Sequence, residues 1–153
     1  RSIMVKNSKR TIILDITYSF SQNPDNSLVS LYLSQGLETD DIEGAFYTVK
    51  ATYGDTLIGG ITLSKRYGTV ILDYVAVTEE YKGKHIGKTL VEMALNHAKG
   101  LGINELFLVT KVEGFFAKLG AVRTEEYGVL LSECNGCLQY NTKCRPVLMK
   151  LKV

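Results

Sequence analysis

Short runs of β-branched and aromatic residues, separated by turn-forming residues, dominate the first half of the chain. They predict strands over residues 11–17, 46–53, 56–63 and 69–77. Gly54-Asp55 is a hairpin turn signal, and Tyr67-Gly68 marks a second reversal of the chain. We therefore expect an antiparallel meander in this part of the protein.

A helical period replaces the strand pattern in two other segments. The turn and capping residues of 21–26 predict a helix that begins near Asn26 or Ser27. Over residues 86–99 apolar side chains recur every three or four positions, which predicts a helix with one apolar face packed on the sheet. Glycines at 100 and 102 are expected to end it, and His97 falls on its polar side, where we expect it to be exposed.

The rest of the chain continues this alternation. The pattern predicts a strand over 105–110, a short helix over 113–119 and a strand from Ala121, with a cysteine-containing loop at 132–146 before the last strand. The fold class expected is mixed α/β (α+β), a mostly antiparallel sheet of six to seven strands flanked by about four helices. With 153 residues, 45% of them hydrophobic, the chain is long enough to bury a core, and we expect one domain over residues 1–153.

Charge and hydropathy exclude several classes of protein. The 18 basic and 16 acidic residues nearly balance, which argues against a dedicated nucleic-acid-binding protein. The apolar runs fall far short of the roughly 20 residues of a membrane span, and the N-terminus lacks the apolar core of a signal peptide. We therefore expect no membrane partner and a cytoplasmic location. Residues 1–3, ahead of Met4, resemble a remnant of an expression vector.

A glycine- and lysine-rich loop between the strand at 69–77 and the helix at 86–99 carries the clearest chemical signal. Backbone amides at a helix start lack intrahelical partners and lie at the positive end of the helix dipole, so this loop can hold a phosphate or pyrophosphate. The P-loop and G-x-G-x-x-G patterns are both absent, and the lysines could also form a solvated surface. The predicted cofactor-binding residues of the loop are Lys82, Gly83, Lys84, His85, Ile86, Gly87 and Lys88.

The loop resembles the acetyl-CoA signature [R/Q]-x-x-G-x-[G/A] of the GNAT acetyltransferases. Lys82 takes the Arg/Gln position and His85 the first glycine, so two of the three positions depart, and Gly87 takes the last small position. His85 places a Cβ where the family often has glycine, although His tolerates positive φ better than most residues. The resemblance continues in family order through VAV, KTLVEMALNHAKGLG, NELFLVT and EGFFAKLGAVR, and spans roughly residues 28–123.

The resemblance implies the GNAT fold, acetyl-CoA as cosubstrate and acetyl transfer to the primary amine of a small molecule by direct attack in a ternary complex. It also implies that the pantetheine chain lies between two splayed strands, beside the backbone of Val75, Ala76 and Val77. LYLSQGL and LVTKVEGFFAKLG resemble short N-acetylglutamate-synthase-like and arsenic-resistance-associated amino-acid acetyltransferases, so an amino acid is one candidate acceptor. Arg123 or Arg145 could then hold its carboxylate. The expected partners are acetyl-CoA and a small amine, with the protein a monomer or homodimer.

Three alternatives stay open: a protein or peptide N-acetyltransferase, a catalytically silent CoA-binding module, and a metal or redox sensor. Many relatives protonate the CoA thiolate with a tyrosine where this chain has Phe116. Tyr127, Tyr140 or water could replace that general acid, and Asp73 and Glu113 are the candidate bases. Glu113 is equally explained as a helix-start charge.

Three cysteines, Cys134, Cys137 and Cys144, lie within eleven residues near the C-terminus. Thiolates at C-x-x-C spacing bind zinc or iron, but a structural zinc site usually needs four protein ligands. The two histidines of the chain are assigned to the loop and the following helix. We therefore expect no bound metal, and a metal site, a redox-active Cys134–Cys137 pair and free thiols remain the alternatives.

Overall fold

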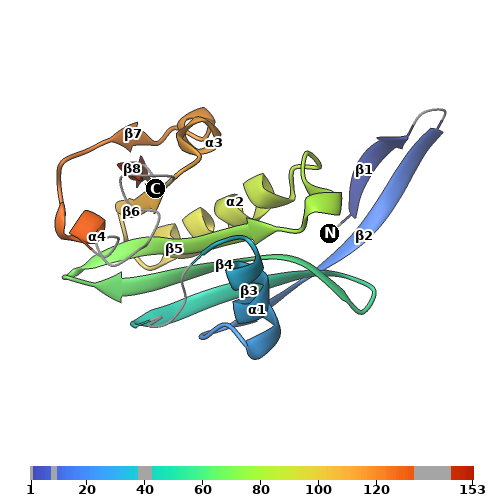
Figure 1. Ribbon diagram of the computed structural model, residues 1–153, viewed down its shortest axis with the longest axis horizontal. Helices are drawn as coiled ribbons and strands as arrows, with labels where there is room; N and C mark the ends of the chain where they lie inside the picture. Colours follow the sequence, from blue (N-terminus) through green and yellow to red (C-terminus); the bar gives the residue numbers. More distant parts are fainter. Residues whose placement is uncertain (1, 8–9, 38–42, 133–145) are drawn as a thin grey trace.

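The computed structural model describes residues 2–7, 10–37, 43–132 and 146–153. In this part of the chain eight strands form one sheet in the order β1-β2-β3-β4-β5-β6-β8-β7 (Figure 1). Neighbouring strands are antiparallel except β5 and β6, which are parallel. The strands are β1 Ser2–Asn7, β2 Arg10–Ser21, β3 Ala45–Tyr53, β4 Thr56–Arg66, β5 Thr69–Val77, β6 Glu105–Thr110, β7 Val122–Arg123 and β8 Val147–Lys152.

The expected meander is confirmed in β3, β4 and β5, which follow one another in sequence and in the sheet. Tyr67 (φ 56°) and Gly68 (φ 74°) are both left-handed between β4 and β5, as a two-residue hairpin turn of the primed type requires. Gly54 (φ 60°) turns the chain between β3 and β4. The structure adds β1 and extends β2, so the N-terminal hairpin, which the sequence pattern did not predict, projects at the opposite end from α3 and β7 (Figure 1).

In the described residues four helices accompany the sheet: α1 Asn26–Ser34, α2 Ile86–Gly100, α3 Glu113–Lys118 and α4 Val129–Ser132, with a 3₁₀ turn over Glu79–Tyr81. α1 begins where the sequence predicts, because an Asp25 carboxylate oxygen accepts a hydrogen bond from the Leu28 amide at 2.9 Å. The Lys50 ammonium beside that carboxylate holds the pKa of Asp25 at about 2. None of the described helices is long and apolar enough to cross a bilayer.

α1 and α2 cover opposite faces of the sheet. Successive strand residues point to opposite sides, and along β5 Val75 belongs to the cluster around α2 whereas Ala76 belongs to the cluster around α1. The larger cluster combines the apolar stripe of α2 with the inner residues of β3, β4, β6 and β8. The expectation of an exposed His97 is wrong: the imidazole is half-buried and stacks on Tyr47 with ring centroids 4.0 Å apart.

The close approach of α1 to β4 leads to a stability prediction. A Cβ at Gly60 would lie 2.4 Å from a methyl carbon of the fully buried Leu28 and 3.1 Å from the Val49 carbonyl oxygen. We expect Gly60→Ala to lower the free energy of unfolding by about 1–3 kcal/mol, because overpacking strains a filled core. Urea denaturation will measure it. At Gly100 a Cβ meets nothing within 4 Å, so Gly100→Ala should be neutral or stabilising, and equal losses in both variants would contradict this packing argument.

Candidate active site

β5 and β6 form a pair at only one position, Ile71 with Phe107. Parallel strands normally keep evenly spaced hydrogen bonds along their length, so a single pair means that the strands diverge. Beyond it lies a cleft of about 980 Å³ lined by Ile71–Val77 of β5 and Leu108–Thr110 of β6. The cleft runs from the loop that precedes α2 to the segment that follows α1.

The loop at one end of the cleft exposes its backbone. Gly83 has φ 79° and a Cβ there would meet nothing within 4 Å, so an incoming group can approach the chain closely. His85 adopts φ 61°, the left-handed conformation that its place in the loop suggested. It is the N-cap residue of α2 but makes no side-chain cap hydrogen bond. The amides of the first helical turn are thus not capped by that side chain, which suits an anion.

Nine of the ten residues predicted to bind the cofactor line this cleft: Val75, Ala76, Val77, Lys82, Gly83, His85, Ile86, Gly87 and Lys88. The tenth, Lys84, is not among the lining residues, and its ammonium donates a hydrogen bond to the Glu80 carbonyl at 3.3 Å. Lys82 forms an exposed ion pair with Glu79 at 2.8 Å, which an anionic ligand can replace at little cost. The cofactor role of these residues stays a prediction.

Two phenylalanines of α3 close the cleft beside α2. A Cβ at Gly87 would lie 3.3 Å from the Phe115 ring, so the small residue lets the two helices approach. Phe116 lines the cleft, is buried, and packs edge-on against Phe115 with ring centroids 4.9 Å apart. The position at which many relatives carry a tyrosine thus presents a phenyl ring and no hydroxyl group.

A β-bulge places Asp73 in the cleft wall. Leu72 pairs with Leu63 and Tyr74 with Thr62, so Asp73 is the extra residue of β5. Both carboxylate oxygens of Asp73 accept hydrogen bonds from the Arg66 guanidinium at 2.7 Å, and the two side chains are only 8% and 12% exposed. Arg66 also donates to the Glu43 carbonyl at 3.0 Å, which ties the segment before β3 to the bulge.

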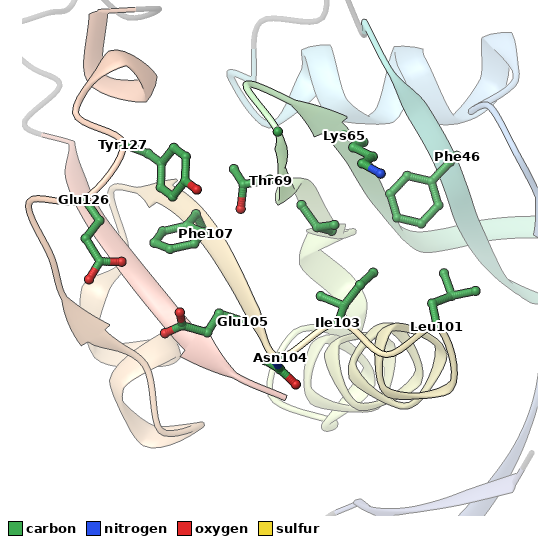
Figure 2. A pocket seen from close by; sticks show the side chains of 12 residues that line it. Phe46, Lys65, Thr69, Leu101, Ile103, Asn104, Glu105, Phe107, Glu126 and Tyr127 are labelled. Atoms are coloured by element: carbon green, nitrogen blue, oxygen red, sulfur yellow. The ribbon is translucent and has the colours of Figure 1, made fainter.

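The structure does not bring the other candidate acids and bases into the cleft. Glu113 is not a lining residue and pairs at the surface with Arg123, whose hydrogen bonds lower the pKa of Glu113 below its ordinary value. Tyr127 lines a second cavity, of about 620 Å³, where β5 and β6 begin. Figure 2 shows its ring beside Phe107 and Thr69, and the Phe107 and Tyr127 centroids are 4.7 Å apart.

Tyr140, Arg145 and the three cysteines lie outside the described residues. Within the described part, no cluster of three His, Cys, Asp or Glu side chains is arranged to hold a metal ion. A metal site, a redox-active pair and free thiols therefore all remain open for the three cysteines.

Sequence reasoning missed the far half of the cleft. The segment after α1, Gln35–Leu37, faces Tyr74 and Lys111 across it. Tyr74 stacks on Tyr32 with centroids 4.9 Å apart, and the Tyr32 hydroxyl is hydrogen-bonded to Thr62 at 2.9 Å. Burial raises the pKa of the Tyr32 hydroxyl. The sequence could have indicated this half of the cleft only by Tyr32, Tyr74 and Lys111. A tyrosine on a predicted helix or strand and a lysine directly after a strand are too common to be specific.

The buried ion pair at the bulge generates a second stability prediction. Replacing Arg66 with Met leaves the Asp73 carboxylate in a largely buried site without its counter-charge, so we expect a loss of about 3–5 kcal/mol in the free energy of unfolding. Arg123→Met removes an exposed partner of Glu113 and should change stability little. Thermal and urea denaturation of the two variants will measure the difference. Similar losses in both would mean that Asp73 is better solvated than its burial implies.

Comparisons with known proteins agree on one family. The acetyltransferase (GNAT) family model matches residues 13–121. An uncharacterized N-acetyltransferase of Chlorobaculum tepidum is 38% identical over 66 residues, which span 41% of this chain and 43% of the relative.

Two solved structures illustrate the likeness of the fold. N-acetylglutamate synthase from Neisseria gonorrhoeae, complexed with coenzyme A and N-acetyl-glutamate, matches with a TM-score of 0.67 and 16% identity over 93% of this chain and 36% of its own. A Bacillus subtilis acetyltransferase in complex with CoA matches with a TM-score of 0.67 and 24% identity over 91% of this chain and 99% of its own. These matches confirm the predicted mixed α/β fold, and with the family model they place the chain in the GNAT acetyltransferase family.

Proposed function

We propose that the protein is an acetyl-CoA-dependent N-acetyltransferase that acts on the primary amine of a small molecule, for which an amino acid is one candidate. The observation that carries this proposal is the cleft between β5 and β6, with a glycine- and lysine-rich loop at one end and the segment that follows α1 at the other. A cleft that extends from this loop to the segment after α1 suits two substrates that meet in its middle. Direct attack in a ternary complex is therefore the mechanism that fits.

The residues of the first half suit coenzyme A. The α2 amides and the ammonium groups of Lys82 and Lys88 would hold its phosphates, because a helix N-terminus and nearby cations both favour negative charge. The edge of β5 beyond Ile71 would align its extended amide-bearing arm. Acetyl-CoA supplies an acetyl group already activated as a thioester.

The chemistry between the two halves depends on Asp73 and on what replaces the absent tyrosine. Asp73 is the one carboxylate among the described lining residues, so it remains our candidate base, and its hydrogen bonds from Arg66 fix its orientation. Glu113 and Tyr127 are weaker candidates, because neither lines the cleft. Two other tyrosines, Tyr74 and Tyr81, do line it and join water as possible proton donors to the departing thiolate.

One observation favours a second candidate function. Phe116 removes the general acid that many relatives use, which is also what a catalytically silent CoA-binding module would tolerate. Both functions predict cofactor binding, and only the enzyme predicts CoA release. We assign the single domain over residues 1–153, a cytoplasmic location and a monomeric or homodimeric state to the same proposal.

The cofactor assignment predicts that acetyl-CoA raises the melting temperature, because a ligand that binds only the folded state stabilises it. Lys82→Glu and Lys88→Glu should each weaken acetyl-CoA binding in calorimetry about tenfold or more, by the loss of one charge-assisted contact. Lys152→Glu makes the same charge change on the exposed end of β8 and is the matched control. Undetectable binding at millimolar acetyl-CoA, or equal weakening in all three variants, would refute the assignment.

Substitution of Phe116 distinguishes the enzyme from the catalytically silent module. If water now protonates the thiolate, Phe116→Tyr should raise kcat for the true acceptor, since a positioned general acid is worth about 10²–10⁴-fold. Phe115→Tyr adds the same hydroxyl one residue away and should not raise kcat. If Tyr74 or Tyr81 already donates the proton, its change to Phe should lower kcat and leave acetyl-CoA affinity unchanged. Tight cofactor binding without CoA release, across amino acids, polyamines and peptides, would favour the silent module.

A further inference from the structure

The half of the cleft away from the α2 loop has an unequal charge balance. Among the described residues that line it, Asp73 and Lys111 are the charged side chains on the walls formed by β5 and the end of β6. The Asp73 charge is compensated, because both of its oxygens accept hydrogen bonds from Arg66. Lys118 of α3 also lines the cleft, so the uncompensated charge among these described lining residues is positive and is shared by the two lysines.

Lys111 reaches across the cleft from the end of β6. Its ammonium lies 4.0 Å from the position that a Cβ of Gly36 would occupy, and Gly36 belongs to the segment that follows α1 on the opposite wall. The last turn of α1 contains no basic residue, so the negative end of that helix attracts a cation from elsewhere in the fold. No described carboxylate forms an ion pair with Lys111.

Lys111 is exposed, so its ammonium is accessible to an incoming anion. Leu37, Leu130 and Pro146 line the same half of the cleft, and Tyr74 adds an aromatic ring. Arg123, which the sequence offered for a carboxylate, lies outside the cleft and is already paired with Glu113.

We propose that the acceptor is an amine that also carries a carboxylate, and that Lys111 binds this carboxylate and so determines acceptor specificity. The inference rests on the proposed acetyltransferase function and deepens it. Lys111 holds the acceptor by its anionic group and takes no part in the acetyl transfer itself.

The test compares amino acids with their carboxamides. For each standard L-amino acid that releases CoA, its carboxamide keeps the amine and loses the negative charge, so we expect its kcat/KM in the natural protein to be at least tenfold lower. Lys111→Met should raise the KM for the amino acid at least tenfold and leave kcat and the KM for acetyl-CoA unchanged. The KM for the carboxamide should not change. Lys152→Met, an equal loss of charge outside the cleft, should leave all these constants unchanged.

A binding measurement separates this inference from the proposed function. Calorimetry of the protein saturated with CoA, titrated with the same amino acids, reports acceptor binding without turnover. Binding that Lys111→Met abolishes would support the carboxylate site even if no acetyl group were transferred. Equal use of amino acids and carboxamides, a preference for diamines over amino acids, or weaker acetyl-CoA binding in Lys111→Met would each overturn the inference.

Discussion

The divergence of β5 from β6 is the constraint on which the rest of the site depends. One pair, Ile71 with Phe107, closes the sheet at the base of the two strands, and the buried contacts of these side chains with Leu130 and Leu148 anchor it. Had the pairing continued, the sheet would have no gap and the α2 loop would face a filled surface. The cleft is therefore a consequence of incomplete strand pairing within an otherwise regular sheet.

Two sets of interactions keep that gap open without weakening the fold. On one face α2 and α3 meet through Gly87 and Phe115, and on the other Tyr32 of α1 stacks on Tyr74 of β5. The bulge at Asp73 adds local twist, and the buried ion pair with Arg66 compensates its charge. Each wall is thus supported from behind by its own helix, and the walls need not touch each other.

Hydrophobic periodicity correctly predicted the helices and strands that are long or that end at clear turn-forming residues. β5 and β6 have the predicted limits, α2 differs by one residue, and the cofactor loop lies where its glycines place it. The N-terminal hairpin was missed because residues 1–3 were interpreted as an expression remnant and no strand was predicted for residues 4–7. His97 was misplaced because helical period alone does not report the aromatic side chains of β2 and β3 that pack against it.

The candidate site was predictable only where local sequence determines it. A glycine loop before a helix is a local feature, whereas the Arg66–Asp73 pair depends on a bulge that no residue pattern announces. Lys111 and Gly36 are 75 positions apart in sequence, and only the tertiary fold brings them together. Glu113 and Tyr127 were chosen by their position in the chain, and neither lines the cleft.

The tight turn at Tyr67-Gly68 limits where residues can be inserted into this protein. Exposed turns usually accept inserted residues, because few contacts depend on them. Here the turn fixes the register of β4 against β5 beside the Arg66–Asp73 ion pair, and an added residue that shifted this register by one position would separate the two side chains. We therefore expect natural and engineered insertions to be excluded from this turn, although it lies at the surface and far along the chain from the α2 loop.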